Sequence, residues 1–285
     1  MPTLTDALLD PLLGAATPSG APISAKGPRI TYFDDATGER IELSTVTLAN
    51  WAAKTANLLR DEFGAGPGSR VAVLLPAHWQ TAAVLLGVWW IGAEVVLTGA
   101  AGPATSGTGA AGPATSGTGA ARPATSGTGA ARPATSGTGA ADIALCTRDR
   151  LAEADDAVAG AGEVAVLSLD PFGKPAADLP IGVTDYATAV RVHGDQVVPE
   201  RVPGPALDGR SVDEVLTEAR RGAQSLGLIA GDRVMSDRSW STPQELVDHL
   251  LAVLAAGASL VQLANPDPAA LERRRVTEKV TRTLD

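Results

Sequence analysis

Four side chains stand at corresponding places in the two halves of the sequence, and they are our candidates for ligand binding. Pro76-Ala77-His78-Trp79 follows one apolar run, and Asp237-Arg238-Ser239-Trp240 follows a second run that matches the first. Together they supply an imidazole, a guanidinium and two indoles, which offer hydrogen bonds, positive charge and flat apolar faces. In open α/β sheets, ligands bind beyond the carboxyl ends of the strands. We therefore predict that His78, Trp79, Arg238 and Trp240 line a small pocket between two subdomains.

These residues also have a purely structural interpretation, which the sequence leaves open. Trp79 and Trp240 can cover edges of the core without binding anything. His78 stands at a predicted helix start, where we expect a surface or hydrogen-bonded histidine and not a general base. The reason is that the sequence fixes no carboxylate or nucleophile beside it. We assign no catalytic residue.

Metal and cofactor chemistry find little support in the composition. Cys146 is the only cysteine, which excludes an internal disulfide and a cysteine-rich metal site. His78, His193 and His249 are too far apart in the sequence for a zinc spacing. The net charge of −9 and the pI near 4.9 argue against nucleic acid and against an anionic membrane surface as partners. We expect no bound metal and no cofactor.

The sequence at the N-terminus and in its most apolar stretch indicates a cytoplasmic protein. Asp6 and Asp10 interrupt the first apolar stretch, which also lacks a basic start, so a secretory signal is not expected. The longest apolar run, Ala82 to Ala93, is 12 residues long and is followed by Glu94. A bilayer needs about 20 apolar residues, so we expect a buried helix here.

The sequence segments that must position the candidate residues occur twice in the chain. Gly64-Ala-Gly-Pro-Gly68-Ser-Arg70-Val71 returns 163 positions later as Gly227-Leu-Ile-Ala-Gly231-Asp-Arg233-Val234. Leu85-Leu86 with Gly92-Ala93 returns 165 positions later as Leu250-Leu251 with Gly257-Ala258. We call each copy a cassette and expect a loop to absorb the difference of two. Two similar units imply paired subdomains. Arg70 and Arg233 are expected to pair with acidic neighbours at the strand entrances, away from any ligand.

The pattern of apolar runs, caps and turn residues predicts an α/β fold of two similar subdomains with mostly parallel sheets flanked by helices. Ser44, Ser211 and Thr242 are predicted helix caps, the last two with a glutamate three residues on. Residues 99–138 are four tandem decapeptides, expected to be a flexible Gly/Ala/Pro/Thr/Ser insertion. The predicted divisions are an N-terminal segment (1–30), a first subdomain (31–98), the insertion (99–138), a strand-helix-strand unit (139–170), proline-rich connecting loops (171–209) and a second subdomain (210–285).

The order of these motifs resembles a known family. A helix, Gly-x-x-x-Gly-x-Arg-Val, an apolar strand, a proline, a second helix and Gly-Ala together resemble the N-terminal domain of the adenylate-forming enzymes, the AMP-binding and acyl-CoA synthetase superfamily. The resemblance covers roughly Thr31 to Leu97 and Leu207 to the C-terminus. It is closer still to a little-characterised bacterial family of short stand-alone relatives. In the superfamily, a Ser/Thr/Gly-rich loop ending in Gly-x-Pro-Lys holds the ATP phosphates, and the resemblance places that loop just before the helix at Ser211.

The chain departs from the superfamily in the parts that carry its chemistry. Val202 to Arg210 contains no such loop, and Thr115 to Ala124 of the repeat is only a distorted version with alanine in place of the lysine. The sequence also ends before the segments that position adenine, Mg²⁺ and the catalytic lysine. We therefore expect a non-catalytic, truncated relative that acts as a binding or partner module. The alternative is an acyl-adenylating, AMP-forming acid–thiol ligase that uses ATP and Mg²⁺ with a partner chain. A homodimer or another protein is expected to cover the truncated face.

One charged run remains. Arg273-Arg-Arg275 lies on a predicted C-terminal helix among acidic residues, and we expect a solvated face there, with an acidic partner or a phosphate as the alternative.

Overall fold

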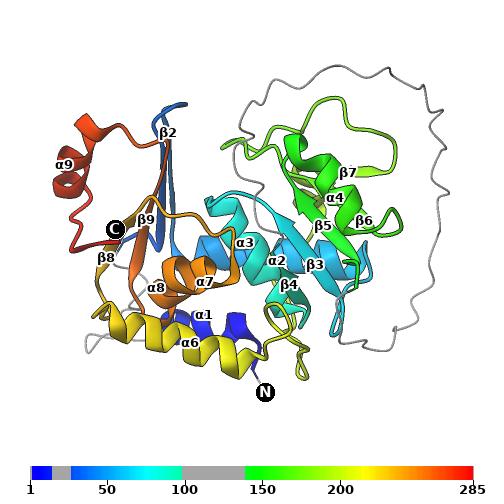
Figure 1. Cartoon of the computed structure of the whole chain (residues 1–285), viewed down its shortest axis with the longest axis horizontal. Helices are drawn as coiled ribbons and strands as arrows, with labels where there is room; N and C mark the ends of the chain where they lie inside the picture. Colours follow the sequence, from blue (N-terminus) through cyan, green and yellow to red (C-terminus); the bar gives the residue numbers. More distant parts are fainter. Residues whose placement is uncertain (1, 15–26, 98–138, 285) are drawn as a thin grey trace, which may run out of the picture.

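The computed structural model describes residues 2–14, 27–97 and 139–284, and these form two five-stranded sheets with helices between and around them (Figure 1). The predicted α/β class with mostly parallel sheets is confirmed. The tandem decapeptides lie outside the described residues. The first sheet has the order β4-β3-β5-β6-β7 and is entirely parallel, with strands β3 (Arg70–Leu74), β4 (Glu94–Val96), β5 (Ile143–Cys146), β6 (Glu163–Val166) and β7 (Val183–Asp185).

The second sheet contains the other five strands and is parallel except at one edge. Its order is β10-β8-β9-β1-β2, with only β1 and β2 antiparallel. The strands are β1 (Ile30–Asp34), β2 (Glu39–Leu43), β8 (Arg233–Ser236), β9 (Ser259–Ala264) and β10 (Arg282–Leu284). The β1–β2 hairpin pairs with β9, so the predicted division at 31–98, which assigned it to the first subdomain, does not follow the sheets. Pairing between strands far apart in sequence leaves no local signal, and this explains the difference.

Each cassette, taken together with the helix that precedes it, folds as a helix, a strand, a second helix and a second strand. The first runs through α2 (Thr45–Asp61), β3, α3 (Trp79–Trp90) and β4, and the second through α6 (Val212–Ser225), β8, the composite helix α7-η4-α8 and β9. The predicted caps are confirmed: Ser44 accepts from the Thr47 N–H, and both Ser211 and Thr242 form complete capping boxes. The pieces of the composite helix are α7 (Pro243–Leu246), η4 (Val247–Leu251) and α8 (Ala252–Ala255).

The two cassettes agree down to their backbone conformation. Gly92 and Gly257 end the corresponding helices with φ of 71° and 74°, a region that glycine enters without steric cost. Each donates its N–H to the carbonyl three residues earlier, at Trp89 and Leu254. The strands start in the same register as well, because Arg70 lies opposite Glu94 and Arg233 lies opposite Ser259. The sequence duplication is therefore a structural one.

The difference of two residues between the cassettes is divided between a loop and a helix. The cap residues His78 and Thr242 are 164 positions apart, so one extra residue lies between strand and helix. Gly92 and Gly257 are 165 positions apart, so the second lies inside the composite helix. There η4 is a π-helical turn, which inserts one residue without ending the helix. Our expectation that a loop absorbs both residues is half wrong.

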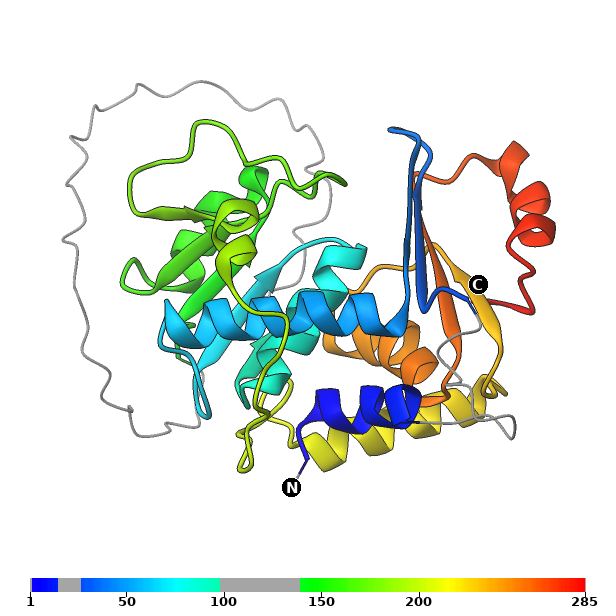
Figure 2. The same ribbon diagram turned by 180° about the vertical axis from the view of Figure 1, so that it is seen from behind.

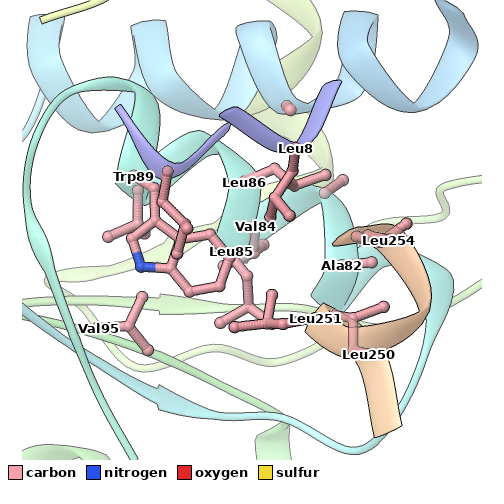
Figure 3. Close-up of a cluster of buried hydrophobic side chains, with 14 of the residues drawn as sticks. Leu8, Ala82, Val84, Leu85, Leu86, Trp89, Val95, Leu250, Leu251 and Leu254 are labelled. Atoms are coloured by element: carbon pink, nitrogen blue, oxygen red, sulfur yellow. The ribbon is translucent and has the colours of Figure 1, made fainter. Parts of the chain in front are cut away.

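The main core lies where the two cassettes meet. All residues of α3 are buried, and Figure 3 shows its leucines packed with those of η4 and α8. Leu8 from α1 (Leu4–Gly14) packs into the same cluster. No helix among the described residues is long and apolar enough to cross a bilayer. The remaining helices are η2 (Arg148–Arg150), α4 (Leu151–Ala157), α5 (Tyr186–Ala189), η3 (Val190–Val192) and α9 (Pro268–Thr277).

The proline-rich stretch 171–209 contains only short elements, namely β7, α5 and η3. The helix α9 covers the outer face of the second sheet (Figure 2), where Leu271 packs against Met235, Val261 and Leu263.

Candidate functional site

The candidate site lies where the carboxyl end of β3 meets the second sheet. His78 and Trp79 follow β3 at the start of α3, and Trp240 follows β8 just before α7. Tyr32, Gln262 and Ser236 form one row across β1, β9 and β8, because Gln262 is the register partner of both of the others. Register partners in a parallel sheet project from the same face, and Tyr32 projects toward the ring of His78.

His78 is buried and presents one free N–H. Its Nδ1 accepts a hydrogen bond of 3.1 Å from the backbone N–H of Gln80, which caps α3. The neutral imidazole assigned from this geometry carries its proton on Nε2. This Nε2 has no hydrogen-bond partner among the described residues, and the nearest carboxylate oxygen, Oε1 of Glu39, lies 3.6 Å away. The imidazole is 2 % exposed and meets the Tyr32 ring edge-on at 4.3 Å between centroids. His78 is thus hydrogen-bonded through one nitrogen, as expected, but it does not lie on the surface.

Glu39 is the carboxylate that the sequence did not place beside His78. It lies at the start of β2, and its Oε1 also accepts a 3.3 Å hydrogen bond from the indole N–H of Trp79. Trp79 in turn packs edge-on against Trp51 at 5.6 Å between ring centroids. Burial, together with the charges of Asp34 and Glu39, raises the pKa of the Tyr32 hydroxyl, so this phenol stays protonated. The site therefore combines one carboxylate with protonated, neutral aromatic groups.

Gln262 and Trp240 contribute two more polar atoms without partners. Gln262 is 1 % exposed; its Nε2 donates to the carbonyl of Arg238 at 3.1 Å, and its Oε1 accepts nothing from the described residues. Trp240 is 2 % exposed, and its indole N–H donates to no acceptor among the residues that the structure describes. A buried polar atom without a partner costs about 1–3 kcal/mol, so these atoms call for a ligand or a water molecule.

Arg238 differs from the other three predicted residues. Its side chain is exposed, and only its backbone joins the site, where its N–H donates to Ser236 Oγ at 3.1 Å. The structure brings His78 and Trp79 together beside Glu39, and Gln262 is hydrogen-bonded to the carbonyl of Arg238, two residues before Trp240. The guanidinium is not part of this buried cluster. The prediction of a pocket formed by all four side chains stays a prediction.

Sequence reasoning missed Tyr32, Glu39 and Gln262. Gln262 had a visible signal, because a glutamine inside the apolar strand Ser259–Ala264 is unusual and has to find hydrogen bonds. Tyr32 and Glu39 had none, because the hairpin reaches His78 only through its pairing with β9.

The segment before α6 is not suited to binding a nucleoside triphosphate. Every backbone N–H from Glu200 to Arg210 donates a hydrogen bond within the chain, the two prolines having none to give. Gly204 donates to Gly92 O at 3.0 Å, and Asp208 donates to Val95 O at 3.1 Å. Two of the acceptors are carboxylates, those of Glu200 and Glu94. No N–H is left to hold a phosphate, and the carboxylates repel one.

The recurring arginines have the structural role that we expected. Arg70 lies 3.5 Å from Glu94, and Arg233 lies 2.5 Å from Glu278. Both pairs lie at the amino ends of their strands, away from the candidate site. Within residues 2–14, 27–97 and 139–284, no group of three or more His, Cys, Asp or Glu side chains is arranged to hold a metal ion.

Comparisons with known proteins relate the chain to one sequence family and one fold. No family model matches it. A protein of Mycobacterium tuberculosis described as a TIGR03089 family protein is 60% identical over 285 residues, which is 99% of this chain and 98% of that protein.

Similar solved structures include an acyl-CoA synthetase of Brucella canis (TM-score 0.68, 17% identity) and an acetoacetyl-CoA synthetase of Streptomyces lividans (TM-score 0.64, 16% identity). Each match covers 99% of this chain but only 46% and 42% of those enzymes. MatB of Rhodopseudomonas palustris gives a TM-score of 0.64 at 15% identity, with 97% of this chain and 48% of MatB covered. The chain thus has the synthetase fold and spans about half the length of these enzymes.

Proposed function

The chain belongs to the TIGR03089 family, and from this premise we propose that it is a non-catalytic binding module built on the acyl-CoA synthetase fold. We further propose that it acts in the cytoplasm, which a single buried cysteine fits.

One observation carries the proposal: the segment that precedes α6 has no free hydrogen-bond donor in its backbone. Phosphoryl transfer depends on donors and cations aimed at the phosphates, because catalysis there is mostly positioning and charge stabilisation. In this chain four of these N–H groups, those of Glu200, Gly204, Asp208 and Gly209, hold the segment against β4 and the end of α3, and the others donate within the segment. Trp89 adds a side-chain hydrogen bond of 2.7 Å to the carbonyl of Ala206. A segment fixed in this way has to break native hydrogen bonds before it can bind ATP.

The carboxyl edge of β3 and β8 is the site that we propose for the ligand. It presents two N–H donors, on His78 Nε2 and Trp240 Nε1, and one acceptor, Gln262 Oε1. A matching ligand group is uncharged and both accepts and donates hydrogen bonds, as the edge of a purine does. The surrounding rings of Tyr32 and Trp79 supply flat apolar contacts.

Two measurements test the proposal. Isothermal titration with a non-hydrolysable acyl-adenylate analogue is expected to show binding that Gln262→Met weakens roughly tenfold, the value of one hydrogen bond of about 1.4 kcal/mol. Gln224→Met, at an exposed glutamine of α6, is the matched control and should bind as the wild type does. Absence of binding, or equal binding by both variants, would reject the ligand site.

A pyrophosphate-release assay with ATP and a panel of carboxylic acids tests the non-catalytic part separately. We expect no release from the chain alone. Release from the purified protein would refute the proposal. Release that appears only on adding a co-purified partner chain would favour the alternative, an AMP-forming ligase completed by a second protein. The homodimer or partner protein expected from the sequence stays a prediction, and sedimentation of a monomer at micromolar concentration would count against the homodimer.

A further inference from the structure

A deep cavity lies at the opposite end of the second sheet from the candidate site. It has a volume of about 1000 Å³, which is within the range of small-molecule pockets. It opens at the amino ends of the strands, beside Arg29 before β1, Arg233 at the start of β8 and Ser259 at the start of β9. The helices α1 and α6, which lie side by side in Figures 1 and 2, form its other side.

One wall of this cavity is apolar. Leu8 and Leu12 of α1, Leu216 of α6 and Leu254 of α8 line it, together with alanines at the end of α8. These side chains come from three separate helices, so the wall is continuous across the contact between α1 and the second cassette. Such a wall favours an aliphatic or aromatic group, because removing apolar surface from water is favourable.

The lining of the cavity also carries an excess of positive charge. Five arginine and lysine side chains and three carboxylates line the cavity, in a chain whose net charge is −9. The carboxylates already have partners: Glu278 pairs with Arg233 and Arg40, Glu42 pairs with Arg40, and Asp232 lies 3.8 Å from Arg282.

Three cations of the cavity are left without a carboxylate among the described residues. Arg220 and Lys279 are exposed and make no ion pair there. The third, Arg29, is only 7 % exposed. Burying a guanidinium without a counter-ion is unfavourable, and burial accordingly lowers the pKa of Arg29.

The guanidinium of Arg29 is held by neutral oxygens and keeps one free edge. Its Nε donates to Thr45 Oγ1 at 3.2 Å, and its Nη1 donates to the carbonyls of Gly257 and Ala258 at 2.8 and 2.7 Å. Its Nη2 makes no hydrogen bond to the described residues. These bonds fix the guanidinium in place, and a fixed donor loses little entropy when it binds an anion.

We propose that this cavity binds a small amphiphilic anion, with a carboxylate or phosphate head group at Arg29, Arg220 and Lys279 and an aliphatic body against the leucine wall. The leucine wall and the cations together specify the ligand, because neither a purely apolar molecule nor a bare anion uses both.

Isothermal titration at low salt with octanoate, octyl phosphate, 1-octanol and inorganic phosphate tests this. Octanoate and octyl phosphate are expected to bind one to one, and the tighter of the two identifies the head group. Octanol and inorganic phosphate should each bind at least roughly tenfold more weakly. In the series hexanoate, heptanoate and octanoate, affinity should rise by up to about fourfold for each methylene. Octanol binding as tightly as octanoate, or no binding of either anion, would overturn the proposal.

A pair of double variants tests the residues. R220Q/K279Q removes two exposed charges that line the cavity, and we expect octanoate to bind roughly fivefold more weakly. R221Q/K174Q makes the same two substitutions at exposed residues outside the cavity, so it changes the net charge equally and should bind octanoate as the wild type does. Both double variants are expected to fold, because none of the four side chains is buried. Equal weakening by both would mean that only net charge matters, and the proposed site would be wrong.

Discussion

Two glycines inside helices predict opposite effects of the same substitution. Gly87 of α3 faces α2, and a Cβ built on it would lie 2.8 Å from the Ala52 carbonyl oxygen and 2.8 Å from Thr55 Cβ. Gly222 of α6 faces the composite helix of the second cassette, and a Cβ there would lie 3.4 Å from Ala252 Cβ, an ordinary contact. The cassettes thus solve the same helix crossing differently, with glycine on the second helix in one copy and on the first helix in the other.

The magnitudes follow from two competing effects. Alanine in a helix interior is about 1 kcal/mol more favourable than glycine. Overpacking a tight contact costs about 1–3 kcal/mol, and a contact of 2.8 Å with a backbone oxygen belongs at the upper end because the oxygen cannot rotate away. We expect Gly87→Ala to lower the free energy of unfolding by about 2 kcal/mol, and Gly222→Ala to raise it by up to about 1 kcal/mol.

Urea unfolding followed by circular dichroism measures both, provided that the slope with denaturant is unchanged. Thr55→Ser removes the methyl group that would lie 3.0 Å from the new Cβ, yet it keeps a hydroxyl for the 2.6 Å hydrogen bond with Tyr186. Combined with Gly87→Ala, it should recover part of the loss. A Gly87→Ala protein that is as stable as the wild type, or more stable, would show that α2 and α3 do not cross as closely as described.

Three further predictions concern single residues. Burial pushes the pKa of Glu278 up, but hydrogen bonds and charges from Arg233 and Arg40 hold it below its ordinary value of 4.5. Its contribution to stability is therefore fully present above that ordinary value and is lost as the pH falls through the lower folded pKa. Glu278→Gln should flatten this part of the acid-unfolding profile, and an unchanged profile would contradict the assignment. Burial raises the pKa of the Cys146 thiol to about 12, so the thiol of the native protein should resist alkylation by iodoacetamide at pH 8. Mass spectrometry measures the extent of labelling, and rapid labelling would mean that the core around Cys146 opens. Ser211→Ala removes a complete capping box and should cost about 1 kcal/mol in urea unfolding, whereas a neutral result would imply that α6 is held by packing alone.

The local elements could be predicted because their signals lie within a few residues. Capping boxes at Ser211 and Thr242 fix helix starts through hydrogen bonds that span three residues. Gly92 and Gly257 end the matching helices because their positive φ values are costly for other residues. A half-buried strand alternates apolar and polar residues, so an uninterrupted apolar run indicates a strand that is covered on both faces. The doubled cassette, the α/β class and the family resemblance all follow from signals of this kind.

The candidate site could be predicted only in part. The sequence located His78, Trp79 and Trp240 at strand ends. This was possible because ligands of open α/β sheets generally bind beyond the carboxyl ends of the strands. It could not supply Glu39, which reaches His78 only through the hairpin that joins β9. It also assigned Arg238 to the same pocket, although the exposed guanidinium lies outside the buried cluster.

The sequence by itself thus determined the elements, their order and their duplication, since caps, turns and periodicity act over a turn of helix or a few residues of strand. Only the tertiary structure decided which strands are neighbours, that a π-helical turn absorbs one inserted residue, and that the N–H groups before α6 are all used within the chain. It also decided that Arg29 is buried beside a large cavity, with no carboxylate of the described residues as its partner. These features join residues up to 230 positions apart, and at such separations the partners of a polar group depend on the packing of whole elements.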